Sequence, residues 1–183
     1  MKSKEIELSK RTAVSHTIRK RKTASLPIRL ITRKAELQGV ILHFGCGKDQ
    51  AGTGLLNAQS GVVVAMEYDP NYVDYPEVLE DQYDIVIANY VLNVLPPKER
   101  KKAIKQIRSC MKKKGVAYIT VRSHKDTKIC GKPEFDGVRT SIRTFQKGYT
   151  LKGFLTELRR YFKNAELFCG SESSRFIIAK VKI

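Results

Sequence analysis

Short apolar runs alternate with helical patterns along most of the chain. The runs are typical of strands buried on both faces, and they lie at residues 40–44, 62–66, 84–88 and 116–121. Apolar residues at helical spacing lie before the first run, at residues 28–34, and between later runs, at residues 55–58 and 98–113. Gly115 is expected to cap the last of these helices. Strands that alternate with helices predict a doubly wound α/β domain, with a sheet that is parallel at its centre and helices on both faces.

The pattern changes in the last third of the chain. Residues 123–150 are rich in Gly, Thr, Lys and Arg and have no clear period, so we expect a long functional loop. A helix is predicted from Leu151 to Phe162. Two further strands, at 166–169 and 176–182, are joined by a Gly-Ser turn and are expected to pair antiparallel.

Length and composition narrow the class of protein. A chain of 183 residues fits one domain, which we place at 26–183 behind a basic N-terminal arm at 1–25. No apolar stretch is long enough to span a membrane, and the N-terminus lacks the apolar core of a signal peptide. Four separated cysteines favour reduced thiols, a cytoplasmic location and no metal cluster: Cys46, Cys110, Cys130 and Cys169.

Charge is distributed unevenly around a net value of +17. Residues 1–48 carry 12 basic and 3 acidic side chains, 49–97 carry 8 acidic and no Lys or Arg, and 98–183 carry 23 basic and 7 acidic. This bias favours a polyanionic partner, of which nucleic acid is the commonest. Solubility and a peripheral membrane surface are the alternatives. The acidic middle suggests a separate face.

A glycine loop, Phe44-Gly45-Cys46-Gly47-Lys48-Asp49, follows the first predicted strand. Ligands of such sheets bind outside the carboxyl ends of the strands, and two glycines let the backbone approach a ligand closely. The loop is no dinucleotide fingerprint, because Gln50 replaces the third glycine, and no phosphate-binding P-loop, because Leu42 and Asp49 stand at required positions.

This loop resembles the first motif of class I S-adenosylmethionine-dependent methyltransferases, and two later segments strengthen the resemblance. Asp69 or Glu67, with Asp69 favoured, stands where that family keeps a carboxylate for the ribose, and 83–95 resembles the strand and loop beside the methionyl group and adenine. His43 stands where most relatives carry an acid, and Asp49 replaces the usual third glycine. The resemblance implies S-adenosylmethionine as cofactor, held by His43, Phe44, Gly45, Cys46, Gly47, Glu67, Asp69, Pro70, Asn89 and Tyr90.

The resemblance also affects the expected strand count. Only about fifteen residues separate Asp69 from Asp84, too few for the helix, strand and helix that usually intervene in the family. We therefore expect a Rossmann-like methyltransferase sheet of six strands, with one edge strand missing and an antiparallel pair at the C-terminus.

A narrower resemblance covers roughly residues 20–165. Segments 22–30, 45–47, 68–70 and 89–95, together with Asp136-Gly-Val-Arg-Thr-Ser-Ile-Arg-Thr-Phe-Gln-Lys147, are similar to methyltransferases associated with DNA phosphorothioation. With the charge, this implies a nucleic-acid substrate, DNA rather than RNA. The expected substrate-binding residues are Arg19, Lys20, Arg21, Lys22, Arg139, Arg143, Gln146 and Lys147.

Methyl transfer from a sulfonium is an in-line displacement, so the protein mainly positions the nucleophile and removes its proton. The catalytic candidates are Asn89, Tyr90, Asn93 and His124. Two other functions stay open. One is a weak or inactive methyltransferase-fold module that binds nucleic acid or a protein, which His43 and Asp49 motivate. The other is methylation of a small molecule.

Overall fold

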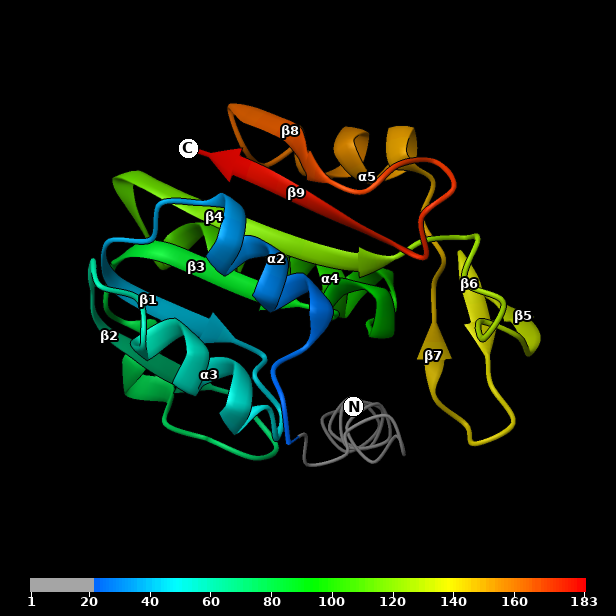
Figure 1. Ribbon diagram of the computed structural model, residues 1–183. Coiled ribbons are helices and arrows are strands. Elements are labelled where there is room, and N and C mark those ends of the chain that lie inside the picture. Colours follow the sequence, from blue (N-terminus) through cyan, green and yellow to red (C-terminus); the bar gives the residue numbers. More distant parts are fainter. Residues whose placement is uncertain (1–21) are drawn as a thin grey trace.

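The computed structural model describes residues 22–183, and a six-stranded sheet forms its centre (Figure 1). The strand order is β2-β1-β3-β4-β9-β8. The first four strands are parallel, β9 is antiparallel to β4, and β8 is antiparallel to β9. The strands are β1 (Gly39–Phe44), β2 (Val62–Tyr68), β3 (Tyr83–Asn89), β4 (Met111–Arg122), β8 (Asn164–Cys169) and β9 (Phe176–Lys182). The six-stranded sheet and its antiparallel C-terminal pair confirm the sequence prediction.

Helices cover both faces of this sheet. They are α2 (Leu26–Lys34), α3 (Gln50–Asn57), α4 (Pro97–Ser109) and α5 (Leu151–Leu158), with short 3₁₀ helices η1 (Pro76–Leu79) and η2 (Leu92–Val94). Figure 1 shows α2 and α3 in front of the sheet and α4 behind it. Neighbouring residues of β1 point to opposite faces, so Ile41 packs with Ile28 of α2 while Leu42 packs with Ile104 of α4. The doubly wound prediction is confirmed.

Two predicted helix ends are wrong. The helix predicted at 98–113 ends at Ser109, and Gly115 lies within β4 instead of capping that helix. Gly115 packs tightly there, because a Cβ would lie 2.9 Å from the carbonyl oxygen of Tyr83. The three exposed lysines before it continue the helical charge pattern, although the backbone is already extended. The helix predicted to reach Phe162 ends at Leu158.

The stretch predicted as a long loop contains a second sheet, which corrects that prediction. Three short antiparallel strands form it: β5 (Lys132–Glu134), β6 (Gly137–Arg139) and β7 (Phe145–Gln146). Strands of two or three residues carry too few side chains to show a period of two.

Ion pairs around the buried Arg100 fasten this small sheet to the helices behind the main sheet. The guanidinium of Arg100 on α4 contacts Asp136, in the β5–β6 turn, at 2.5 Å and Glu157 on α5 at 2.8 Å. The ammonium of Lys147 contacts Asp136 at 2.6 Å. The ion pairs thus join the β5–β7 sheet to α4 and α5.

Two sequence predictions concern the termini and membranes. Residues 1–21 of the predicted N-terminal arm lie outside the described residues, and the boundary of the arm at residue 25 stays a prediction. Lys22 is exposed, and α2 begins at Leu26. Within 22–183, no helix is both long enough and apolar enough to cross a membrane.

Candidate cofactor and substrate site

A cavity of about 1010 Å³ lies at the carboxyl ends of the parallel strands. The loops after β1, β2, β3 and β4 line it, because parallel strands end at the same edge of a sheet. Gln146 of β7 and Arg175, just before β9, line it as well. The small sheet therefore contributes to the cavity.

The glycine loop after β1 makes a tight turn at the cavity wall. Gly45 and Gly47 have φ values of 67° and 59°, in the left-handed region that glycine adopts most readily. The carbonyl of Tyr68 accepts hydrogen bonds from the amides of Gly45 (2.7 Å) and Cys46 (3.1 Å). A Cβ on Gly45 would lie 2.4 Å from Cγ2 of Val91. Backbone conformation and space thus both require glycine at position 45.

Asp69, directly after β2, closes this loop from the other side. Its carboxylate accepts hydrogen bonds from the amides of Gly47 (3.0 Å) and Asn71 (2.9 Å). Burial raises the pKa of Asp69, and these hydrogen bonds oppose the shift. Asp69 lines the cavity, whereas Glu67 lies within β2, paired in register with His43, and is not among the lining residues. Of the two carboxylates considered, Asp69 is therefore the one at the cavity, and its role toward a ribose stays a prediction.

His43 and Asp49, the two departures from the family pattern, serve the fold locally. Nδ1 of His43 lies 2.9 Å from the hydroxyl of Thr53, and burial lowers the pKa of His43 to about 4, so the ring is neutral at pH 7. Asp49 is the N-cap of α3 and accepts a hydrogen bond from the amide of Gly52 at 3.0 Å. The cavity stays open beside both residues.

Cys46 lines the cavity but is no nucleophile. Burial, followed by the nearby carboxylates of Glu67 and Asp69, raises the pKa of Cys46 to about 12. A thiol with this pKa stays protonated at neutral pH, and covalent catalysis needs the thiolate.

The loop after β3 presents unsatisfied polar atoms at the cavity. Nδ2 of Asn89 donates to the hydroxyl of Ser25 at 2.8 Å, and the buried Oδ1 of Asn89 has no hydrogen-bond partner among the described residues. Tyr90 has a φ of 61°, rare for a residue with a side chain, and its amide donates to the carbonyl of Thr120. A left-handed backbone at a residue with a side chain and a buried acceptor without a partner are both common at functional sites, and the roles of Asn89 and Tyr90 stay predictions.

The structure gathers most of the residues expected at the cofactor and separates several expected at the substrate. The predicted residues that line the cavity are His43, Phe44, Gly45, Cys46, Gly47, Asp69, Pro70, Asn89, Tyr90, Asn93 and Gln146. The described ones that do not are Lys22, Glu67, His124, Arg139, Arg143 and Lys147. Arg19, Lys20 and Arg21 lie outside the described residues.

Two of the cations that do not line the cavity form ion pairs within the protein. Arg139 pairs with Glu134 and donates to the carbonyl of Arg143, while Lys147 pairs with Asp136. Their roles toward the substrate stay predictions.

Five charged residues of the cavity were missed in the sequence: Arg122, Asp126, Lys128, Arg175 and Lys102. A signal existed for the first, because Arg122 directly follows the apolar run of β4 and so had to lie at the carboxyl edge. Arg175 precedes β9. It reaches the same edge because β9 runs antiparallel to β4.

The sheet order, the glycine loop and the carboxylate after β2 define a class I methyltransferase fold. A family model described as a methyltransferase domain matches residues 15–170, and the chain belongs to this family. It is an S-adenosylmethionine-dependent methyltransferase.

Solved structures with the same fold share little sequence. A DhpI complex with S-adenosylhomocysteine (SAH) is 13% identical and matches over 85% of this chain and 82% of its own, with a TM-score of 0.58. The PH0226 protein from Pyrococcus horikoshii OT3 is 14% identical over 84% and 87%, with a TM-score of 0.61. A Burkholderia thailandensis 1,6-didemethyltoxoflavin-N1-methyltransferase with SAH is 12% identical over 98% and 85%, with a TM-score of 0.58. No curated protein sequence matches the chain.

The residues of the cavity fit this cofactor. The backbone at Gly45 and Gly47 leaves no side chain between the loop and a ligand, Asp69 offers a carboxylate, and Asn89 offers a buried acceptor without a partner among residues 22–183. S-adenosylmethionine supplies an electrophilic methyl group on a sulfonium.

Proposed function

We propose that this methyltransferase acts on nucleic acid, DNA rather than RNA. The observation that carries the proposal is the charge of the cavity. Its basic lining residues within the described chain are Lys48, Lys102, Arg122, Lys128 and Arg175. Three carboxylates line it as well, those of Asp49, Asp69 and Asp126, and each accepts hydrogen bonds from the protein itself. Five cations against three carboxylates give the described lining a net positive charge, which favours an anionic substrate.

The outer surface supports the same substrate. The acidic stretch 49–97 supplies edge strand β2 and η1, on one side of the sheet. The basic stretch 98–183 supplies α4, β4, α5, β8 and β9, on the other side. A polyanion is attracted to the second side and repelled by the first, which favours one orientation on a phosphate backbone.

The choice of DNA rests on the narrower resemblance to the phosphorothioation-associated methyltransferases. Its most specific segment, Asp136 to Lys147, forms β6 and β7 and brings Gln146 into the cavity. Asp136, Lys147 and Glu157 meet in one ion-pair network around Arg100. Side chains of this segment therefore share one structural role beside the site. This supports treating residues 136–147 as a single motif.

The loop after β3 is the best-placed group to position the methyl acceptor. Its Asn89 keeps Oδ1 free because Nδ2 is bound to Ser25, so it offers an acceptor for an N–H group. Asn93 lies on the same loop and lines the cavity. The protein's contribution is to hold and orient the nucleophile within about 3 Å of the reacting carbon.

A small-molecule substrate is the second candidate. The structural neighbours favour it, since they include a 1,6-didemethyltoxoflavin-N1-methyltransferase and a mitomycin 7-O-methyltransferase. The cavity volume, which a cofactor would share, also suits a small acceptor.

A methyl-transfer assay tests the proposal. The protein is incubated with methyl-labelled S-adenosylmethionine and one of four substrates: duplex DNA, DNA containing phosphorothioates, RNA or a small-molecule cell extract. The nucleosides or extract compounds are then separated and counted. We expect label in a DNA nucleoside, with Asn89→Ala reducing the rate at least tenfold and the exposed control Lys163→Gln retaining it. Label confined to a small-molecule extract, with none in nucleic acid, would refute the nucleic-acid substrate.

A further inference from the structure

We infer that the side chains at the end of β4 and the start of β9 form a subsite for a phosphate group of the methyl acceptor. The subsite comprises Arg122, Lys128 and Arg175, with Asn93 and Gln146 beside them. This inference deepens the proposed function and rests on it for the polynucleotide as the source of the phosphate.

Arg122 is held in a fixed orientation. Its Nε and Nη2 donate to one oxygen of Asp126, each at 2.7 Å, and its Nη1 lies 3.4 Å from Oε1 of Gln146. The other oxygen of Asp126 accepts the amide of Lys128 at 3.1 Å. A guanidinium carries five N–H donors, and these contacts use three of them. The planar group is therefore oriented in advance, with donors left for a ligand.

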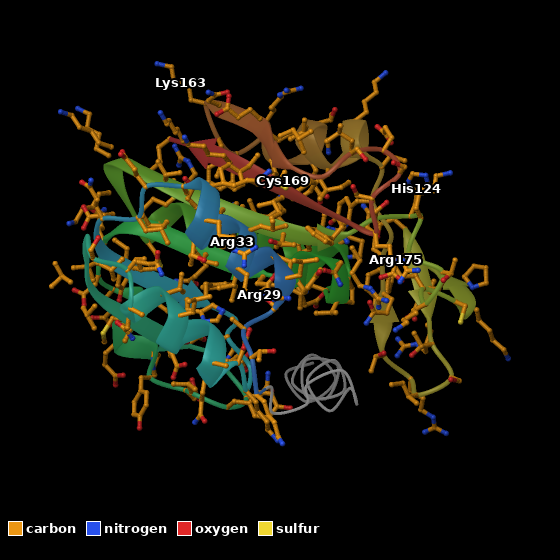
Figure 2. All side chains as sticks on the ribbon, viewed as in Figure 1. Arg29, Arg33, His124, Lys163, Cys169 and Arg175 are labelled. Carbon is orange, nitrogen blue, oxygen red and sulfur yellow. The ribbon has the colours of Figure 1, made fainter. Side chains whose placement is uncertain are left out.

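Lys128 and Arg175 bring two further positive charges to the subsite, beside the carboxylate of Asp126. The carbonyl of Arg175 accepts the amide of Ser123 at 2.9 Å, which holds the start of β9 beside the end of β4. Figure 2 shows Arg175 at this end of the sheet, near His124. Arg175 and Lys128 are both exposed and line the same cavity as Arg122. Three cations thus face one carboxylate, which leaves an excess of positive charge for an anion.

Asn93, on the loop after β3, lies against the end of β4 beside the subsite. It is fully buried, and its Nδ2 finds no hydrogen-bond acceptor in the part of the chain that the structure describes. Its Oδ1 faces the amide of Arg122 at 3.4 Å, so the amide group is turned with its donor elsewhere.

The subsite is distinct from the place expected for the cofactor's ribose. Asp69 follows β2 and Arg122 ends β4, three strand spacings away, or about 14 Å at the usual spacing. The end of β3 is much closer to the subsite, because Asn89 pairs in register with Thr120 of β4, two residues before Arg122. The phosphate would therefore lie on the substrate side of the cavity, close to the loop after β3.

Calorimetric titrations in the presence of SAH test the subsite. The probes are a 12-base-pair DNA duplex, a deoxynucleoside 5′-monophosphate and the same nucleoside without phosphate. Arg122→Gln and Arg175→Gln are expected to weaken binding of both phosphate-bearing probes about tenfold, as for loss of a charge-assisted hydrogen bond, and to leave nucleoside binding unchanged. The matched control, Lys163→Gln, removes one exposed charge from the opposite end of the molecule (Figure 2) and is expected to weaken binding no more than about twofold.

The outcomes separate the subsite from the proposed function. Equal weakening of the duplex in all three variants would indicate a diffuse basic surface and overturn the subsite, while nucleic-acid binding stands. Arginine-dependent binding of the monophosphate, without binding or methylation of the duplex, would support the subsite for a phosphorylated small molecule and overturn the polynucleotide. Arg175→Gln keeps the test valid if Arg122→Gln fails to fold. Failure of both variants to weaken either phosphate probe would overturn the inference.

Discussion

His43 lies in the interior at the end of β1, where a charged ring would be unsolvated. Burial lowers its pKa to about 4, against about 6.5 in an unfolded chain, so the folded protein binds this proton less readily than the unfolded protein. Above pH 6.5 the ring is neutral in the folded and the unfolded protein, so His43 does not lower the free energy of unfolding. As the pH falls from 6.5 toward 4, the unfolded chain binds the proton first, and the free energy of unfolding decreases.

This shift predicts an acid-sensitive free energy of unfolding. Between pH 7.5 and 5, His43 should account for a loss of about 2 kcal/mol. Urea unfolding of wild type and His43→Gln at both pH values measures it. We expect a shallower pH dependence for His43→Gln and the wild-type dependence for His124→Gln, at an exposed position. Identical curves for wild type and His43→Gln would show that His43 is not buried in the neutral form.

Individual residues of the site differ in how far the sequence could predict them. Gly45, Gly47 and Asp69 directly follow strong strand patterns, so their place at the carboxyl edge followed from the parallel order. Arg175 reaches the cavity only because β9 reverses direction beside β4, and Lys128 only through the turn that Asp126 closes. Such residues depend on tertiary pairing, which local sequence patterns do not reveal.

At the scale of elements, the β5–β7 sheet depends on the ion-pair network around Arg100. The side chain of Arg100 is 4% exposed, and removing it leaves Lys147 as the remaining cation beside Asp136 and Glu157. Arg100→Met is expected to destabilise the fold by about 3 kcal/mol, the usual cost of breaking a buried pair. Lys112→Met, whose pair with Asp84 is exposed, should cost less than about 1 kcal/mol. Denaturant unfolding compares them, and equal costs would contradict the network.

The ion-pair network also explains why the sequence of residues 123–150 predicts a loop. β7 has two residues, and the β5–β6 turn is held through Asp136 by Arg100 of α4, which lies far away in sequence. The six-strand count, in contrast, followed from the family resemblance and a segment length, since the stretch between β2 and β3 is too short for another crossover. Chain length limits topology, whereas short strands need partners that a pattern cannot name.

The whole molecule carries a net charge of +17, with the acidic residues concentrated in 49–97. Binding of duplex DNA through six or more phosphates predicts that log K falls with log salt at a slope of about −5 or steeper. Fluorescence anisotropy at several salt concentrations measures the slope. A slope near zero would contradict DNA binding. The double variant Lys180→Glu and Lys182→Glu, which reverses two surface charges, should make the slope shallower.

Calorimetric titration with S-adenosylmethionine and SAH tests the central claim most directly, because every proposed step depends on the cavity at the carboxyl edge. We predict saturable binding in the micromolar range, weakened at least tenfold by Asp69→Ala and unchanged by Glu166→Ala, on exposed β8. No binding of either compound at millimolar concentration would contradict the account, since a methyltransferase whose cavity is open and complete must bind its cofactor.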